Sequence, residues 1–440
     1  MWSNWAGTHR CVPVAIERPK SAREVAGAVG RAADAGRTVR AAGSGHSFSP
    51  CVPTDGTLVD LGRLDRVLDA DPASGLVKAE AGITLAALDR GLLERGLALP
   101  NLGDIDAQSL AGALATGTHG TGARLPNLSA QVEALELVTG TGERRTLTRD
   151  DGDLLRAARI GLGSLGIVTA VTLRCVPAFR LRGVDTTLPL EEVLTSLDER
   201  VDAHDHFEFW TFPHSPLALT RTNDRTDAPA RAGGWGRVSA DWLHDVLLDN
   251  HALELLSRAG RRFPRAIPRI NRFAASAASG RERVDWSHRV FASPRLVRFD
   301  EMEYAIPREH AADAVRGARE ILERYPVNFP VELRFVAADD ALLSPAHGRD
   351  TAYVAVHVFR GMDGEAPFRE VEKLMAGWGG RPHWGKRSFL SARELKTRYP
   401  AWDAFAAARA ELDPDGRFEN PWARRTLGAV LQRKAQPSPR

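Results

Sequence analysis

Two glycine-rich stretches in the first part of the chain place histidine, serine and threonine residues among glycines, which have no side chain. They are residues 43–47 (Gly-Ser-Gly-His-Ser) and the longer run over residues 109–122. Glycines let a ligand come close to the backbone and turn amides toward a phosphate, and serine and threonine hydroxyls add hydrogen-bond donors. A cofactor with a pyrophosphate group would suit both stretches, and a simple tight turn would also explain either one alone.

Neither stretch matches a common nucleotide-binding motif. A Gly-x-Gly-x-x-Gly motif that began at Gly43 would need a third glycine where the chain has Phe48, and no helix clearly follows. A P-loop needs Gly-Lys followed by Ser or Thr, which the chain lacks. The two stretches therefore favour a nucleotide cofactor site of another kind.

Glu332 and Arg334 are the first candidates for acid–base or substrate-binding chemistry. They stand two residues apart in Val331–Val336, an otherwise apolar and strand-like run, so their side chains share one face. A structural salt bridge would account for the pair, whereas an active site would use Arg334 to bind a substrate oxygen. His383 and Lys386 lie close together around a Trp-Gly pair, which argues against an ordinary solvated loop.

Three other histidines have less specific surroundings. His357 stands in the strand-like run Tyr353–Phe359, where it either faces the same cavity as Glu332 or packs in the core. His204 and His206 have an i, i+2 spacing that could hold a metal, but no third ligand is near in sequence and a closed zinc site needs four. We therefore expect these two histidines to be structural or to lie on the face of a second domain, and predict no metal site.

Strands and helices in mixed order must position these groups. Strands are expected at residues 38–42, 57–61, 75–80, 132–138, 167–173, 206–212, 298–305, 331–336 and 351–359. Helices are expected at residues 21–36, 85–95, 242–257 and 308–324. Because the two do not alternate regularly, the sequence predicts an α+β fold. The pattern of the sequence changes near residue 178, which predicts a domain boundary there. The Arg-rich section over residues 221–295 shows no regular pattern, and the tail after Gly428 is expected to be disordered.

The composition excludes several classes of protein. The chain has 440 residues and a net charge of only +3, with no long Lys/Arg run, which argues against a nucleic acid partner. Cys11, Cys51 and Cys175 do not make a disulfide framework, so a reducing cytoplasm is expected. The N-terminus does not read as a signal peptide, and no apolar run is long enough to span a membrane, so only peripheral membrane contact stays open.

Six short motifs in a fixed order carry a resemblance to a known family. They are Asn4-Trp5, residues 43–47, 115–122 (Ala-Thr-Gly-Thr-His-Gly-Thr-Gly), 165–168, 332–334 and 383–386, followed by an ending from Leu412 to Asn420. Together they cover nearly the whole chain. In this order they resemble the vanillyl-alcohol-oxidase-type flavoproteins, and within them the sugar-1,4-lactone oxidases and dehydrogenases. Alditol oxidases share the same motifs.

The resemblance implies an architecture and a cofactor. FAD would bind in a two-part N-terminal domain, residues 1–178, with its isoalloxazine ring at the interface with a cap domain. The cap, residues 179–395, would be built on an antiparallel sheet with helices and would bind the substrate. Residues 396–440 would form a C-terminal segment that packs back on the FAD-binding domain.

The resemblance also gives the two glycine-rich stretches a role. His46 would either form a covalent bond to the flavin 8α-methyl carbon or contact the flavin without one. His119 would lie in the cofactor loop, although a structural histidine bonded to a backbone carbonyl would also fit the sequence. The positions that resemble FAD-lining ones are Ala42, Gly43, Ser44, Gly45, His46, Ser47, Ser109, Leu114, Gly117, Thr118, His119, Gly120, Thr121 and Ile167.

The implied reaction oxidises a CH–OH group of an aldono-1,4-lactone, with hydride transfer to flavin N5 and electrons passed to O₂ or to an acceptor such as cytochrome c. Arg334 would bind the substrate oxygen, and Glu332 would hold Arg334 and a substrate hydroxyl or act as base. Lys386 would place positive charge near flavin N1, and His383 would contact the substrate or serve as base. An open-chain polyol as substrate stays open, and a non-catalytic flavin-binding module is a more distant alternative.

Overall fold

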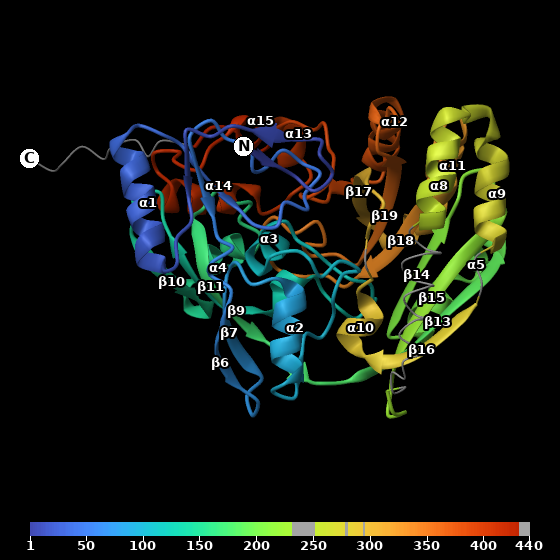
Figure 1. Ribbon diagram of the computed structural model, residues 1–440, viewed down its shortest axis with the longest axis horizontal. Helices are drawn as coiled ribbons and strands as arrows, with labels where there is room; N and C mark the ends of the chain where they lie inside the picture. The colour runs from blue at the N-terminus through green and yellow to red at the C-terminus, as the bar shows by residue number, and fades with distance from the viewer. Residues whose placement is uncertain (231–250, 278–279, 294, 431–440) are drawn as a thin grey trace, which may run out of the picture.

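Two antiparallel sheets, one of five strands and one of eight, form the frame of the molecule (Figure 1). The computed structural model describes residues 1–230, 251–277, 280–293 and 295–430. In Figure 1 the five-stranded sheet and its helices occupy one side, in blue and green, and the eight-stranded sheet stands on the other. Strands and helices mix without regular alternation, which confirms the predicted α+β fold.

The N-terminal half adds a small parallel sheet to the five-stranded one. The parallel sheet has the order β3-β5-β4, and the antiparallel sheet has the order β10-β9-β11-β7-β6. The strands are β1 (Trp2–Ser3), β2 (Arg10–Cys11), β3 (Ala15–Glu17), β4 (Val39–Ala42), β5 (Thr57–Asp60), β6 (Val67–Asp71), β7 (Leu76–Glu80), β8 (Leu97–Ala98), β9 (Val132–Val138), β10 (Arg144–Thr148), β11 (Ile167–Arg174) and β12 (Val176–Pro177). The helices are α1 (Ala22–Asp34), α2 (Leu85–Leu93), α3 (Leu110–Ala115) and α4 (Asp153–Arg159).

Helix α1 shows how the local sequence sets an element. The Ser21 side chain accepts a hydrogen bond from the Glu24 amide and so caps the first turn. Val25 and Val29 lie on the buried face, and the helix ends before Gly36, whose φ of +64° favours glycine. The helix predicted over residues 21–36 is therefore confirmed.

The eight-stranded sheet begins with β13 and has the order β16-β13-β15-β14-β18-β19-β17-β20. Its strands are β13 (Arg180–Pro189), β14 (His206–Thr211), β15 (Leu217–Thr226), β16 (Arg281–Trp286), β17 (Phe299–Pro307), β18 (Val331–Val336), β19 (Thr351–Phe359) and β20 (Arg381–Pro382). The helices after β13 are α5 (Leu190–Thr195), α6 (Leu197–Ala203), α8 (Leu253–Arg262), α9 (Ile267–Ala277), α10 (Ser287–Phe291), α11 (Ala311–Glu323), α12 (Glu365–Ala376), α13 (Ala392–Lys396), α14 (Trp402–Leu412) and α15 (Pro421–Leu427). Across the described residues, no helix has both the length and the apolar character needed to span a membrane.

Alternation along the middle strands sorts the side chains of this sheet onto two faces. Glu332 pairs with Trp210 on one side and Ala355 on the other, and Glu301 pairs with His357. Directly paired residues point to the same face. The face that carries charged groups presents Glu208, Trp210, Glu301, Glu303, Glu332, Arg334 and His357. The opposite face is apolar and packs under helices α11 and α12.

The C-terminal helices return to the N-terminal half, where Figure 1 shows α13, α14 and α15 in red beside the first elements of the chain. The Arg40 guanidinium donates hydrogen bonds to the carbonyl oxygens of Phe418 and Gly163. The Asn420 side chain donates to the carbonyl oxygen of Cys51. The end of the chain therefore braces both flanks of the first glycine-rich stretch.

The Arg-rich section over residues 221–295 is more regular than expected. In its described part, β15 continues to Thr226, and α8, α9, β16 and α10 follow. In α8 and α9 the arginines recur on the outward face at spacings of three and four, a helical pattern that the high charge obscured. Most of the helix predicted at 242–257 lies outside the described residues, and so does the tail after residue 430.

The run over residues 109–122 is not a loop throughout. Its first part, Leu110–Ala115, forms helix α3, with Ser109 at the N-cap position. Leucine and alanine are strong helix formers, so this part of the run is helical despite Gly112. The second glycine-rich loop therefore begins at Thr116.

Asp89 of α2 is a buried carboxyl group that has no ion-pair partner among the described residues, and its Oδ2 accepts no hydrogen bond. Burial, with a smaller contribution from Asp106, raises the pKa of Asp89 to about 8, against an ordinary value of 3.8. Between these two pH values unfolding releases a proton, so this group lowers stability as the pH rises. We expect Asp89→Asn to stabilise the fold by about 1–3 kcal/mol near neutral pH.

Thermal unfolding of the wild type and of Asp89→Asn between about pH 4 and pH 8 checks this expectation. The difference in Tm should be smallest at the acid end, where the unfolded state is only about half ionised at Asp89, and should grow toward pH 8. Asp65→Asn, at an exposed position, is the control. If the Tm of Asp89→Asn is at or below that of the wild type across the whole pH range, the raised pKa of Asp89 in the folded protein is contradicted.

Candidate active site

A cavity of about 1080 Å³ lies in the N-terminal half, between three glycine-containing segments. These segments fall within residues 43–47, residues 109–116, which include helix α3, and residues 161–166, and Trp422 of α15 adds to the wall. The returning C-terminal segment therefore closes one side of the cavity. The sequence singled out the first two segments, and the third, with its Gly-Leu-Gly-Ser-Leu-Gly sequence, had not been assigned to the cofactor.

The backbone of the first loop is free to bind a negatively charged group. The amides of residues 44–47 donate no hydrogen bond to any described residue. Gly45 has a φ of +73°, a conformation that helps to turn successive amides to one side. A Cβ at Gly43 would lie 2.0 Å from Ser109 Oγ and 3.1 Å from Ser109 Cβ, so the close approach of the first loop to the start of helix α3 favours glycine. These features fit the pyrophosphate group of a flavin dinucleotide.

A second cavity, of about 1030 Å³, lies between the loops of the N-terminal half and the charged face of the eight-stranded sheet. The residues common to both cavities are His46, Ser47, Gln108 and Thr116. The two cavities therefore adjoin at His46. Burial, and then the positive charge of Lys386, lower the pKa of His46, so its imidazole is neutral at physiological pH. The ring stacks on Trp5 with centroids 5.6 Å apart.

The wall of the second cavity has an apolar part and a charged part. The apolar side chains are Trp210, Phe212, Leu253, Phe299 and Phe329. The carboxyl groups are Asp104, Glu301, Glu303 and Glu332, and the permanent cations are Arg295, Arg334 and Lys386. Four carboxyl groups against three cations favour the uptake of one further proton in this cavity.

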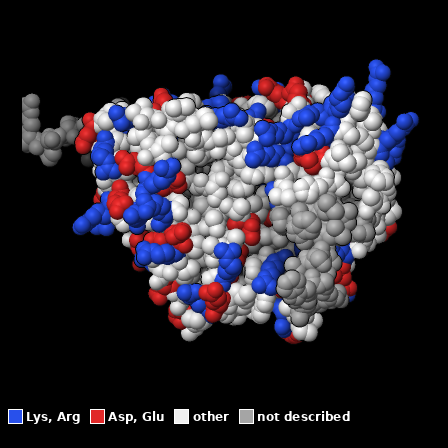
Figure 2. Space-filling model, viewed as in Figure 1, with Lys and Arg blue, Asp and Glu red and all other residues white. Residues whose placement is uncertain are grey.

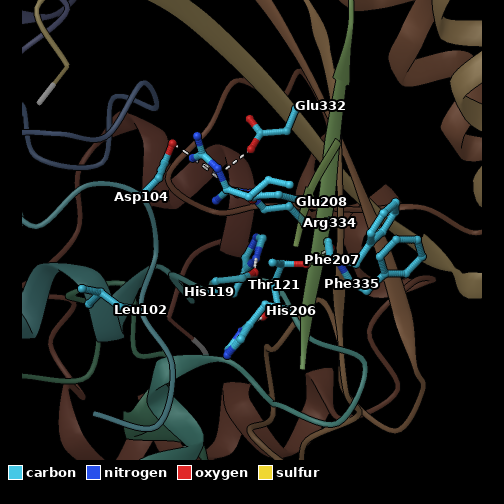
Figure 3. Close-up of polar contacts among 12 residues, drawn as sticks. Leu102, Asp104, His119, Thr121, His206, Phe207, Glu208, Glu332, Arg334 and Phe335 are labelled. Carbon is cyan, nitrogen blue, oxygen red and sulfur yellow. Dashed lines mark hydrogen bonds and ion pairs between the residues drawn. The ribbon is translucent and has the colours of Figure 1, made fainter. Parts of the chain in front are cut away.

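Arg334 sits at the centre of the charged part, as Figure 3 shows. Its Nε lies 2.9 Å from Glu208 Oε2, and its Nη2 lies 3.3 Å from Asp104 Oδ2 and in close ion-pair contact with Glu332. Burial opposes the charge on Arg334, but the three carboxylates outweigh it and raise the pKa well above its usual value. Nε and Nη2 are buried against these carboxylates. Nη1 forms no ion pair or hydrogen bond with any described residue, so it is the nitrogen of this guanidinium left for a ligand oxygen.

Asp104 connects the N-terminal half to the cap. Its side chain forms a close ion pair with Arg295 as well as the contact with Arg334, and its carbonyl oxygen accepts a hydrogen bond from the Ser293 amide. Burial opposes ionisation of Asp104, but the two arginines outweigh it and hold its pKa well below its usual value. Asp104 therefore stays ionised and fixes the guanidinium of Arg334 across the domain interface.

Glu332 is the carboxyl group best placed to exchange a proton. Burial raises the pKa of Glu332, and the negative charges of Asp104 and Glu208 add to this, while Arg334 partly offsets it. Its Oε2 lies 3.7 Å from Nε2 of His357. A carboxyl group whose pKa moves toward neutrality is better suited to act as a general base than an exposed one.

His357 and Glu301 extend this arrangement toward Lys386. The Nδ1–H of His357 donates to the carbonyl oxygen of Pro330, so Nε2 can accept a proton, and Nε2 lies 3.5 Å from Glu301 Oε1. Burial lowers the pKa of His357, but Glu301 outweighs it and raises it overall. Glu301 Oε2 in turn lies 2.5 Å from Lys386 Nζ. The chain of contacts runs from Glu332 to Lys386 along the sheet face.

His119, Glu303 and His383 form a buried cluster whose ligand atoms lie within 4.8 Å of one another. The Gly385 amide donates to Nδ1 of His383, so the neutral ring carries its proton on Nε2 and offers no lone pair to a metal there. Burial, and then Lys386, lower the pKa of His383 to about 3, although Glu303 opposes this. His383 is therefore a neutral hydrogen-bond donor, which argues against its use as a base.

The second glycine-rich loop is hydrogen-bonded to strands β14 and β18 of the eight-stranded sheet. Thr121 Oγ1 donates to the Phe207 carbonyl oxygen at 2.5 Å and accepts from the Phe335 amide, and the Gly122 amide donates to the Phe335 carbonyl oxygen. Nδ1 of His206 donates to the Thr121 carbonyl oxygen at 2.7 Å, as Figure 3 shows. His206 thus serves to hold the loop, as expected of a structural residue.

The structure places the predicted site residues in three environments. The first cavity takes Gly43, Ser44, Gly45, His46, Ser47 and Ser109, and the second takes His46, Ser47, Thr118, His119, Glu332, Arg334, His383 and Lys386. Leu114 and Ile167 pack in hydrophobic cores. Ala42, Gly117, Gly120 and Thr121 are not among the residues that line either cavity. His357, left open between core and cavity, lines the second cavity, and His204 pairs with Asp224.

Sequence reasoning missed most of the carboxyl groups of the second cavity. Glu301 and Glu303 alternate along β17 in the same way as Glu332 and Arg334 along β18, so their Glu-Met-Glu pattern could have revealed them. Glu208 alternates similarly in β14. Asp104 follows a glycine in an irregular loop and carries no such local signal.

The two joined cavities, one fitted to a dinucleotide and one lined with charged groups beneath an antiparallel sheet, define an FAD-dependent oxidoreductase. A family profile described as an FAD binding domain matches residues 13–148. The chain belongs to the D-arabinono-1,4-lactone oxidase family, whose profile matches residues 171–426. Both findings confirm the resemblance drawn from the six motifs.

Several known proteins are similar over nearly their whole length. An L-gulono-1,4-lactone dehydrogenase of Mycobacterium tuberculosis is 48% identical, with 97% of this chain and 99% of that one covered. An L-gulonolactone oxidase of Bos taurus is 35% identical, with 95% and 96% covered. An alditol oxidase of a Streptomyces species is 34% identical, with 97% and 98% covered. The solved structure of a cholesterol oxidase from Brevibacterium sterolicum has a TM-score of 0.83 and 20% identity, with 97% and 96% covered, and shows the same fold.

Proposed function

We propose that the protein oxidises a CH–OH group of an aldono-1,4-lactone of the L-gulono- or D-arabinono- type, with FAD as the hydride acceptor. The observation that carries the proposal is the junction of the two cavities at His46. The second cavity offers carboxylates and N–H donors in alternation, which suits a small, neutral compound with several hydroxyl groups. A sterol would set its hydrocarbon rings against these charged groups and offer them almost no hydrogen bonds, so we do not extend the likeness to cholesterol oxidase beyond the fold.

The first cavity would hold FAD, and each loop has a part in this. The free amides of residues 44–47 would bind the pyrophosphate, and the close approach at Gly43 and Ser109 would let the cofactor lie against the backbone. When bound, FAD accepts the hydride from the carbinol carbon of the substrate. The chain then has to bind the substrate oxygen, take up its proton and supply positive charge.

Arg334 would bind the substrate oxygen through Nη1, because its Nε and Nη2 face the carboxylates of Glu208, Asp104 and Glu332. Its permanent charge favours the alkoxide over the alcohol. Glu332 would accept the hydroxyl proton at Oε2, because its pKa is raised and Oε2 also faces Nε2 of His357. His383 would donate a hydrogen bond from Nε2–H to a substrate oxygen. Lys386 would supply the positive charge needed where negative charge accumulates during hydride transfer.

Turnover by the purified, flavin-loaded protein on a panel of lactones and polyols tests the proposal. We expect L-gulono-1,4-lactone or D-arabinono-1,4-lactone to give a kcat/KM at least about tenfold above that of sorbitol or xylitol. The reverse order would favour an alditol oxidase, the alternative that the Streptomyces relative at 34% identity supports. Reduction of the flavin by no member of either class would contradict both enzyme readings and favour a non-catalytic flavin-binding module.

The electron acceptor and the compartment are further parts of the proposal. We propose O₂ or an acceptor such as cytochrome c, and peroxide formed in air, set against reduction of cytochrome c without air, separates the two. Cys11, Cys51 and Cys175 are free thiols, which supports a reducing cytoplasm.

We also propose a division into an FAD-binding domain of residues 1–178, a substrate domain of residues 179–395, and a C-terminal segment of residues 396–440. The start of the second sheet at β13 and the hydrogen bonds of Phe418 and Asn420 support this division.

We propose that His46 bonds covalently to the flavin 8α-methyl carbon. Its imidazole lies where the two cavities adjoin and is neutral at physiological pH, so a ring nitrogen keeps a lone pair for the bond. Formation of the bond removes one hydrogen from the methyl group and one from the ring, and the two electrons pass to the flavin and then to the external acceptor. We expect the yellow colour to stay with acid-precipitated wild type and to be lost from acid-precipitated His46→Ala.

His204→Ala is the matched control, because His204 pairs with Asp224 away from both cavities and should keep the bound colour. A colourless precipitate from the yellow wild-type protein would replace covalent attachment by non-covalent contact. That result would leave the proposed reaction intact, because turnover is measured separately.

A further inference from the structure

The hairpin of helices α8 and α9 presents a surface that the proposed reaction does not use. Three large apolar side chains stand far into solvent there: Leu255 is 69% exposed, and Phe263 and Phe273 are each 61% exposed. Phe263 lies directly after α8, and Leu255 and Phe273 belong to the two helices. Apolar groups gathered on an exposed surface mark a site of interaction. We call this the hairpin surface.

The hairpin surface is also strongly basic. Residues 251–277 contain six arginines and one acidic residue, Glu254, a net charge of six minus one, or +5, in a chain whose total is +3. The arginines are Arg258, Arg261, Arg262, Arg265, Arg269 and Arg272, and all are exposed. Arg265, Arg269 and Arg272 form no ion pair with any residue that the structure describes. Figure 2 shows basic side chains projecting from the edge of the molecule where Figure 1 places α9.

The inner face of the hairpin is fixed to the rest of the protein. Asn271 is fully buried and its side chain donates to the carbonyl oxygens of Pro213 and Val327, and Asn328 donates to the carbonyl oxygen of Ser257. Exposed residues recur on the outer face at spacings of three and four, so each helix is amphipathic with arginine and apolar groups together outside. The hairpin is therefore an anchored platform rather than a loose arm.

We propose that the hairpin surface docks the protein onto an anionic lipid bilayer. Arginines attract lipid phosphates, and phenylalanine and leucine side chains enter the boundary between headgroups and acyl chains, as in helices that lie in the plane of a membrane interface. A second copy of the chain is a poorer occupant, because two surfaces of charge +5 would face each other. Leu253, the first residue of α8, lines the second cavity, so docking brings the substrate cavity close to the lipid surface.

Co-sedimentation of the flavin-loaded protein with vesicles tests the proposal. The probes are vesicles of phosphatidylcholine alone and vesicles with roughly a third phosphatidylglycerol. We expect binding only to the anionic vesicles, and a loss of at least about tenfold in that binding for Arg265→Gln/Arg269→Gln/Arg272→Gln. Phe263→Ser/Phe273→Ser should weaken binding to a similar extent, and added salt should weaken it further.

A triple variant on the N-terminal half, Arg63→Gln/Arg90→Gln/Arg144→Gln, removes the same charge from exposed positions elsewhere and should bind as the wild type does. None of these residues lines either cavity, so turnover of substrate in solution should be unchanged in every variant. Absence of wild-type binding, or equal binding of the two triple variants, would overturn the proposal. A dimer in solution that Phe263→Ser/Phe273→Ser dissociates would assign the surface to a second copy instead.

Discussion

Arg334→Lys is expected to lower kcat/KM by about 10²–10³-fold, because an ammonium group cannot reproduce the geometry of this guanidinium. Arg334 faces Asp104, Glu208 and Glu332 at once through Nε and Nη2, while its Nη1 forms no ion pair or hydrogen bond with any described residue. A lysine keeps the charge but offers a single point of contact, so either the carboxylates or the substrate oxygen loses its donor. Steady-state kinetics on the preferred lactone, together with the rate of anaerobic flavin reduction, measure the effect.

Arg182→Lys is the matched control for this experiment. Arg182 pairs with Glu282 on strands of the same sheet, but it does not line either cavity. Both variants should keep their flavin spectrum, which separates a catalytic loss from a folding loss. If Arg334→Lys does not fold, Asp104→Asn removes only one of the three carboxylates and should still lower kcat/KM by about tenfold. A kcat/KM for Arg334→Lys within about threefold of the wild type would remove Arg334 from the reaction.

Glu332→Gln is expected to lower kcat by about 10²–10⁴-fold, the range for loss of a general base. Glutamine keeps the shape of the side chain but accepts no proton. In the wild type, kcat should fall as the pH drops through the raised pKa of Glu332, because the protonated carboxyl group cannot accept the hydroxyl proton. In Glu332→Gln this acidic decline should disappear. A pH profile of flavin reduction for both proteins is the measurement.

Glu372→Gln is the control for the loss of a buried carboxyl group. Glu372 binds the Tyr304 hydroxyl and the Phe389 amide, and it lies outside both cavities. The Glu372→Gln variant should keep the wild-type pH profile of flavin reduction. An unchanged acidic decline in Glu332→Gln would assign the proton to another group, and His357 would then be the first candidate because its Nε2 is an acceptor. A higher KM with an unchanged kcat would instead limit Glu332 to substrate binding.

Local pattern was sufficient for many of the elements and for one wall of the first cavity. The run Val331–Val336 has the period of a strand, so the shared face of Glu332 and Arg334 followed directly from backbone geometry. The Gly-Ser-Gly-His-Ser loop likewise carries its own backbone requirements, and it forms a wall of the first cavity as expected. These features depend on neighbouring residues, which is why short motifs in a fixed order could indicate the family and its cofactor.

Long-range packing assembled the second cavity: local pattern could indicate the charged residues on its strands, but not which groups they meet. Asp104 meets Arg334 only because a loop of the N-terminal half crosses to the sheet of the cap, and Glu301 meets Lys386 only through the docking of the residues after β20. The protonation of these groups depends on burial and on charges brought from distant parts of the chain. Packing also decides the role of His383, a candidate base in the sequence. The Gly385 amide donates to its Nδ1 and burial lowers its pKa, so this side chain is a neutral hydrogen-bond donor.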